Sequence, residues 1–153
     1  ASRFKLLGPL SEKIRENPVL GSGFGTSITY ETSDPRALEN NPDGLYTTYS
    51  FEWGYLDTWI EMGIFGLVAY LSLLLTLFRY GWKLYKKYIQ HALESSLILG
   101  LLAGLVVLSA IHITTPYLNH PLGIGYLLLT TAIFVSLKKD ISIKNSHELA
   151  REE

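Results

Sequence analysis

Two long uncharged apolar runs dominate the second half of the chain. Residues 95–137 hold no Asp, Glu, Lys or Arg over 43 positions, and residues 62–78 form a second run of 17. A bilayer core takes about 20 apolar residues per helix, so the longer run fits two helices and a turn. Two prolines and an asparagine at residues 114–121 mark that turn. The pattern predicts three transmembrane helices, at about 55–78, 96–115 and 121–137.

The first of these helices reaches full length only if residues 55–61 form its first turns. Asp57 and Glu61 lie four residues apart there and would share one helix face. Aromatic residues of this segment would lie at the headgroup layer, as Trp and Tyr often do. We interpret the two acids as the boundary of the helix, with their carboxylates still in contact with water.

The first 53 residues are more polar. Apolar residues recur at helical spacing within residues 3–16 and predict a short amphipathic helix that is bent or begins near Pro9. Gly21, Gly23 and Gly25 alternate with other residues, which is typical of a tight backbone turn pressed against other structure. Their spacing does not match a dinucleotide-binding loop. Residues 30–50, rich in Asn, Asp, Pro, Ser and Thr, are predicted to form a loop.

Basic residues indicate an orientation. Residues 79–95 hold four basic side chains and one acid, and Lys138 and Lys139 begin the tail at 138–153. By the positive-inside rule both segments are cytoplasmic, and residues 1–53 and the turn at 114–121 lie outside. The predicted fold is an all-α membrane protein, a multi-spanning helical bundle with an extracytoplasmic loop at 1–53. The net charge of −1 and the absence of cysteine do not narrow this class.

Four features, in their order along the chain, resemble the C-terminal half of the O-antigen ligase and polymerase superfamily of bacterial membrane glycosyltransferases. They are Arg3 at the start of the amphipathic helix, the segment ENPVLGSGFG at Glu16–Gly25, the polar loop, and the segment YLDTWIEMGIFGL at Tyr55–Leu67 running into a span. The motifs cover residues 1–78, and the order of spans covers the rest. Since the chain begins with Ala1 and has a long polar segment outside, further spans are expected upstream.

The resemblance includes one departure. In ligases of the superfamily a His-Asn-like pair precedes a Gly-x-x-Gly pair by nine residues. Gly63 and Gly66 supply the glycines here, and Glu52 stands at the position of the histidine. This difference favours a polymerase over a ligase.

The resemblance implies transfer of a glycan from undecaprenyl diphosphate to a sugar hydroxyl, in O-antigen, capsule or exopolysaccharide assembly. The enzyme would invert the anomeric centre and act at the outer face of the bacterial cytoplasmic (inner) membrane. Its partners would be the lipid-linked glycan donor, the glycan acceptor and the lipid bilayer, with a chain-length regulator as a further candidate and without nucleic acid. No cofactor is expected, and no metal, since no His or Asp cluster has metal-ligand spacing.

Two groups are needed for this chemistry. A cation must meet the charge of the leaving diphosphate, and Arg3 matches a family position of that kind; Arg36, in the external loop, is the second candidate. A base must accept the proton of the attacking hydroxyl. Glu52 is the first candidate, because a carboxylate held partly out of water is a stronger base. His120, in the turn before the last span, is its first substitute.

Simpler roles remain open for each residue. Arg3 would then be a solvated side chain, and Glu52 an acid near the start of a helix. Gly63 and Gly66, like the pair Gly100 and Gly104, would serve helix packing. His112, within the second predicted span, would be a neutral imidazole bonded to a neighbouring helix. An O-antigen ligase, and a membrane transporter or non-enzymatic membrane component, remain as alternative functions.

Overall fold

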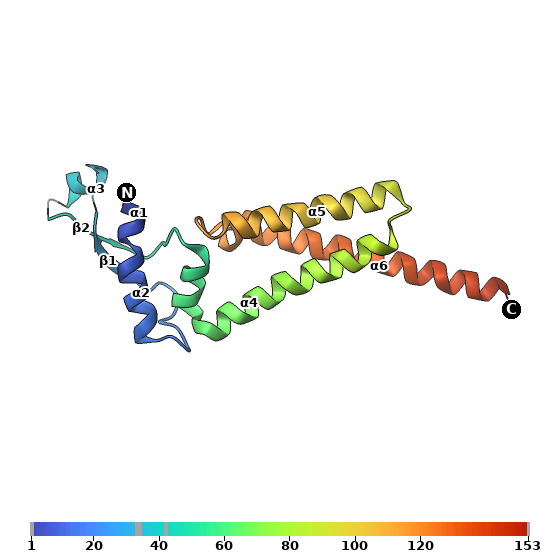
Figure 1. The fold of residues 1–153 in the computed structure, drawn as a ribbon, viewed down its shortest axis with the longest axis horizontal. Coiled ribbons are helices and arrows are strands. Elements are labelled where there is room, and N and C mark those ends of the chain that lie inside the picture. Colours follow the sequence, from blue (N-terminus) through green and yellow to red (C-terminus); the bar gives the residue numbers. More distant parts are fainter. Residues whose placement is uncertain (1, 33–34, 42, 153) are drawn as a thin grey trace. The chain divides into compact units, whose positions relative to one another are not determined.

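The computed structural model describes residues 2–32, 35–41 and 43–152; side chains are described for residues 4–32, 35, 38, 39, 41 and 43–140. The chain forms two compact units, Ala1–Leu71 with Ile111–Pro116, and Ser72–Ala110 with Tyr117–Glu153. Figure 1 labels the α-helices and strands along the chain. In chain order the elements are α1 (Ser2–Lys5), α2 (Leu7–Glu16), β1 (Ile28–Glu31), α3 (Pro35–Asn40), β2 (Leu45–Thr48), α4 (Gly54–Lys87), α5 (Ala92–Ile111), the 3₁₀ helix η1 (Tyr117–Asn119), which is unlabelled in Figure 1, and α6 (Pro121–Glu152).

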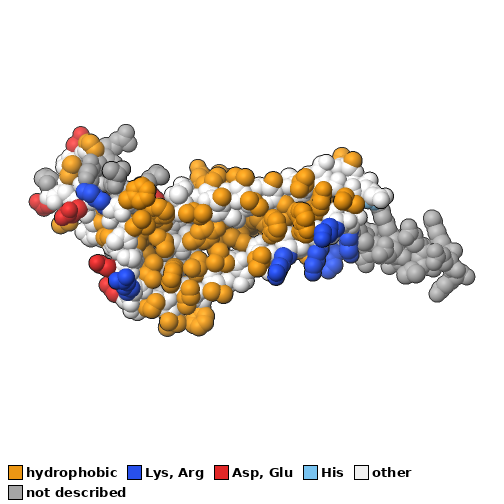
Figure 2. Space-filling view, in the orientation of Figure 1, with side chains coloured by type: hydrophobic (Ala, Val, Ile, Leu, Met, Phe, Trp, Pro, Cys, Tyr) orange, Lys and Arg blue, Asp and Glu red, His pale blue; other side chains and the backbone are white. Residues whose placement is uncertain are grey.

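The chain is mostly helical, and three of its helices are long and apolar enough to cross a membrane. They are α4, α5 and the part Pro121–Asp140 of α6. Hydrophobic side chains cover much of the visible surface (Figure 2). The predicted helical class and the three apolar helices are thereby confirmed. The extracytoplasmic position of residues 1–53 stays a prediction, and the segment predicted as a tail from residue 138 continues α6 as helix to Glu152.

An antiparallel pair of strands lies where the sequence predicted only a loop. β1 pairs with β2 so that Ile28 faces Thr48 and Glu31 faces Leu45. The hydroxyls of Thr29 and Thr47 are 2.7 Å apart in a hydrogen bond across the pair. Thr and Tyr favour strands, and cross-strand pairs of this kind stabilise a sheet. The all-α prediction was therefore wrong for this segment, because the turn-forming residues between the strands concealed two short strand patterns.

A buried apolar cluster holds the first unit together. It consists of Leu6, Leu10, Ile28, Phe51 and Ile60, which join α2, β1 and the first turns of α4. The helical hydrogen bonding is interrupted at Leu6, between α1 and α2, although the backbone angles of Leu6 stay helical at φ −71° and ψ −23°. Pro9 explains this break, since proline has no N–H to donate to the carbonyl four residues earlier and its ring crowds that carbonyl. The amphipathic face predicted for residues 3–16 thus forms part of this core.

The second unit is built from close helix contacts. The hydroxyl of Tyr126 in α6 donates to the carbonyl of Leu101 in α5 at 2.6 Å. That hydroxyl occupies space left by Gly104, where a Cβ would collide with it, whereas a Cβ at Gly100 would meet nothing within 4 Å. The expected packing role is therefore observed for Gly104 and not for Gly100.

Candidate functional site

The helix α4 is broken at Gly63. This residue has φ 69° and ψ −172°, so α4 is two helical segments, 54–62 and 64–87, joined at a glycine. Backbone angles in this region are essentially restricted to glycine. The prediction that residues 55–61 form the first turns of one continuous span was wrong for this reason. Asp57 and Glu61 belong to a separate short segment that precedes the long one.

The glycine-rich loop after α2 caps the C-terminal end of this short helical segment. The amide of Ser22 donates to the carbonyl of Ile60 at 2.6 Å, and the amide of Gly23 donates to the carbonyl of Glu61 at 3.1 Å. The last carbonyls of a helix have no partner within the helix itself. The loop supplies those partners from a distant part of the sequence.

The carbonyl of Pro18 binds the start of the helical segment that follows the break. It accepts a hydrogen bond from the amide of Ile64 at 3.0 Å and another from the indole Nε1 of Trp59 at 3.0 Å. Because Ile64 opens the second segment of α4, its amide also has no partner within that segment. One loop therefore binds both sides of the break.

Two glycines permit this close approach. A Cβ on Gly21 would lie 2.5 Å from the amide nitrogen of Gly63, and a Cβ on Gly63 would collide with the carbonyl oxygen of Val19. The predicted tight turn against other structure is confirmed at Gly21. Gly23 and Gly25 also have positive φ, 90° and 79°, but a Cβ on either would meet nothing within 4 Å.

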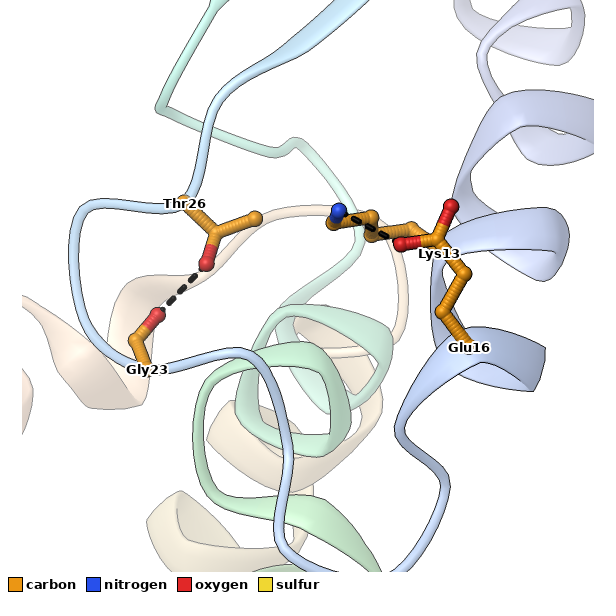
Figure 3. Close-up of polar contacts among 4 residues, drawn as sticks. All are labelled: Lys13, Glu16, Gly23 and Thr26. Carbon is orange, nitrogen blue, oxygen red and sulfur yellow. Dashed lines mark hydrogen bonds and ion pairs between the residues drawn. The ribbon is translucent and has the colours of Figure 1, made fainter.

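Polar contacts on either side of the loop are local (Figure 3). The Thr26 hydroxyl donates to the carbonyl of Gly23 at 2.8 Å, which fixes the turn after the loop. Lys13 and Glu16 form an ion pair of 2.6 Å at the end of α2. An exposed pair of this kind contributes little to stability. Glu16, the first residue of the segment ENPVLGSGFG, thus engages a neighbour on its own helix.

Glu52 lies on a segment that is anchored on both sides. It is half-buried and follows Phe51, which is only 1% exposed. The ring of Trp53 packs edge-on against Phe4, with centroids 6.1 Å apart. Gly54 begins α4, and its amide donates to the carbonyl of His112 at 3.1 Å. The backbone that carries Glu52 is thereby held by contacts to the core, to α1 and to His112 in the turn after α5.

His112, predicted as a neutral imidazole within the second span, lies just after the end of α5 at Ile111, and its contact with Gly54 was not foreseen from the sequence. Its side chain is fully buried, and a Cβ on Gly54 would lie 2.6 Å from its Nδ1. The rings of Tyr55 and Tyr70 pack on it with centroids 4.7 and 5.7 Å away. Burial lowers the pKa of His112, which favours the neutral imidazole. A lone histidine in an apolar run was the available signal, but its contact with Gly54 joins residues far apart in sequence.

His120 lies in the second unit, whereas Glu52 lies in the first. It is exposed and precedes α6, where its Nδ1 accepts from the amide of Leu122 at 3.4 Å. Its carbonyl accepts from the amide of Ile124 at 3.0 Å. These contacts make it the N-terminal cap of α6. The backbone of Arg3 lies in α1 and that of Arg36 in α3, but both side chains lie outside the described residues.

The described residues thus define a mostly helical class with one small strand pair and three long apolar helices. Within the described part of the chain, no group of three or more His, Asp or Glu is placed to hold a metal ion. Comparison with protein-family models, with curated proteins and with solved structures finds no match for this chain.

Proposed function

We propose that this chain is part of a polymerase-type glycosyltransferase that moves a glycan from undecaprenyl diphosphate to a sugar hydroxyl. The observation that carries the proposal is the contact between two segments on which the resemblance rests. The loop of ENPVLGSGFG binds both sides of the break in YLDTWIEMGIFGL through four hydrogen bonds. Two motifs of one functional unit are expected to meet in space, and these two do.

Glu52 is proposed as the base. As the acceptor oxygen attacks the anomeric carbon, its proton passes to the carboxylate, and the bond from that carbon to the diphosphate oxygen breaks. Undecaprenyl diphosphate leaves with the bonding electrons, and the anomeric centre is inverted. A base must be held in a fixed position to act in this way. The anchored segment from Phe51 to Gly54 supports that role for Glu52.

Arg3 is proposed to bind the diphosphate. A guanidinium stays ionised and can bind two phosphate oxygens at once, so it would offset the charge that develops as the donor leaves. The support for this role is the position of Arg3 in the family pattern and the packing of its helix neighbour Phe4 against Trp53, the residue after Glu52.

Replacing Glu52 tests the base. Glu52→Gln keeps the shape of the side chain but removes the proton acceptor, so polymer elongation should fall by roughly 100-fold or more. The chain-length distribution of surface polysaccharide, measured at equal amounts of protein in the membrane, reports this loss. Glu31→Gln, at an exposed position of β1, is the matched control and should retain long chains. Normal long chains in Glu52→Gln would refute the assigned role.

Replacing Arg3 tests donor binding separately. Arg3→Ala should shorten the polymer and raise the donor concentration needed for half-maximal rate, and Arg3→Lys should recover only part of the loss because ammonium cannot bind bidentately. Lys5→Ala, on the same short helix, is the control. If Arg3→Ala and Lys5→Ala need the same donor concentration for half-maximal rate, Arg3 does not bind the donor and is only a solvated side chain.

A further inference from the structure

Exposed apolar side chains gather around the break in α4. Leu20 is 79% exposed, Phe24 77% and Phe65 67%, and Val19 and Met62 are also exposed. These five residues are called the apolar bend. The loop residues among them are held at the break by the hydrogen bonds of Ser22 and Gly23. Figure 2 shows hydrophobic side chains over this part of the first unit.

The apolar bend continues the exposed face of a helix that is apolar enough to cross a membrane. From Phe65 onward, Val68 and Leu71 are exposed as well, at the spacing of one helix face. A face of this composition on a membrane-spanning helix is suited to contact with acyl chains. Because the loop is bound to Ile60, Glu61 and Ile64, it lies at the depth of the first turn after Gly63.

Part of the loop backbone has the internal partners that it would need outside water. Non-helical backbone at membrane depth requires partners for its polar groups. The amides of Gly21, Ser22 and Gly23 donate to carbonyls of Asn17, Ile60 and Glu61, and the carbonyl of Pro18 accepts two hydrogen bonds. These partners lower the cost of taking this part of the loop out of water, and they lie beside large exposed apolar side chains.

We propose that the apolar bend inserts into the lipid bilayer, so that Leu20, Phe24 and Phe65 contact acyl chains. The loop that carries ENPVLGSGFG is then an interfacial element and not an aqueous loop. This inference rests on the membrane setting of the proposed function and is independent of glycosyl transfer. It also places the bend where a lipid-linked donor would arrive within the bilayer.

The chain has no cysteine, so single cysteines can be introduced without background. Leu20→Cys and Phe24→Cys, in the full chain reconstituted in phosphatidylethanolamine and phosphatidylglycerol vesicles, would each carry an environment-sensitive fluorophore. Lipids with nitroxides on the acyl chain should quench both probes. A membrane-impermeant maleimide should label the unmodified cysteines at least tenfold more slowly than a cysteine in water.

Tyr49→Cys is the matched control, because Tyr49 is 75% exposed and lies just after β2 among polar residues. Its probe should escape quenching, and its thiol should react rapidly. Fast labelling of Leu20→Cys and Phe24→Cys would overturn the proposal. Slow labelling without quenching would overturn it too, since protein and not lipid would then cover the bend. If the probes are quenched but the chain has no enzymatic activity, insertion of the apolar bend is supported and only the glycosyltransferase assignment is refuted.

Discussion

At the scale of single residues, Gly63 and Gly21 determine whether the two motif segments can meet. Gly63 has a backbone conformation that other residues avoid, and Gly21 approaches it too closely for any side chain. The sequence allowed only part of this to be foreseen. Alternating glycines indicated a pressed turn, but the surface they press on lies some 40 residues away and could not be inferred from local spacing.

Gly63→Ala should therefore destabilise the first unit by about 3 kcal/mol, because backbone strain adds to the collision with Val19. Gly23→Ala, whose Cβ would meet open space, should cost only about 1 kcal/mol from its positive φ. Thermal unfolding in detergent micelles, followed by tryptophan fluorescence, measures both. Equal losses of stability in the two variants would mean that the close approach of the loop to Gly63 does not contribute to stability.

His112 should make the stability of the first unit depend on pH. Burial holds the pKa of His112 below its ordinary value of 6.5, so the unfolded chain binds the proton more readily than the folded chain. The stabilising contribution is complete above pH 6.5 and is lost as the pH falls below that value. The free energy of unfolding, measured from pH 7.5 to 5, should show this decline. Tyr55 and Tyr70 pack on the imidazole and keep it out of water.

In His112→Gln this part of the acid decline should disappear. His120→Gln, at an exposed histidine outside the cluster, should keep it. An unchanged decline in His112→Gln would show that other groups cause the loss of stability at low pH.

At the scale of elements, the uncharged runs located three long helices because hydrophobic length is a strong signal. The same signal failed at residues 55–63, where the continuation of a span depended on one glycine bound by a distant loop. It failed again at β1 and β2, since four-residue strands stabilised by Tyr30–Tyr46 and Thr29–Thr47 pairs are too short to stand out. Glu52 was selected by motif spacing, whereas its anchoring by Gly54 and His112 is a tertiary effect.

The contact between α5 and α6 yields a prediction with an internal control. Gly104→Ala should destabilise the second unit by about 1–2 kcal/mol, because its Cβ would displace the Tyr126 hydroxyl. Gly100→Ala, in open space on the same helix, should be neutral or stabilising. Tyr126→Phe removes the colliding hydroxyl, so the cost of Gly104→Ala should fall by at least about 0.5 kcal/mol in that background. Additive losses would show that the two residues do not interact.

At the scale of the whole molecule, three long apolar helices support a membrane setting. The contact between the two motif segments, and the anchored backbone around Glu52, support a single site. A transporter would use the same helices, and a ligase would use the same lipid-linked donor. What separates these functions is the product formed from that donor.

The most direct measurement is elongation by the purified full chain in proteoliposomes supplied with an undecaprenyl diphosphate-linked repeat unit. The account predicts a ladder of lipid-linked products that grow by whole repeats, lost in Glu52→Gln and kept in Glu31→Gln. Transfer only to lipid A core or protein would instead identify a ligase. Solute flux without any change in the lipid-linked glycan, from protein that is folded and inserted, would contradict the proposed enzyme.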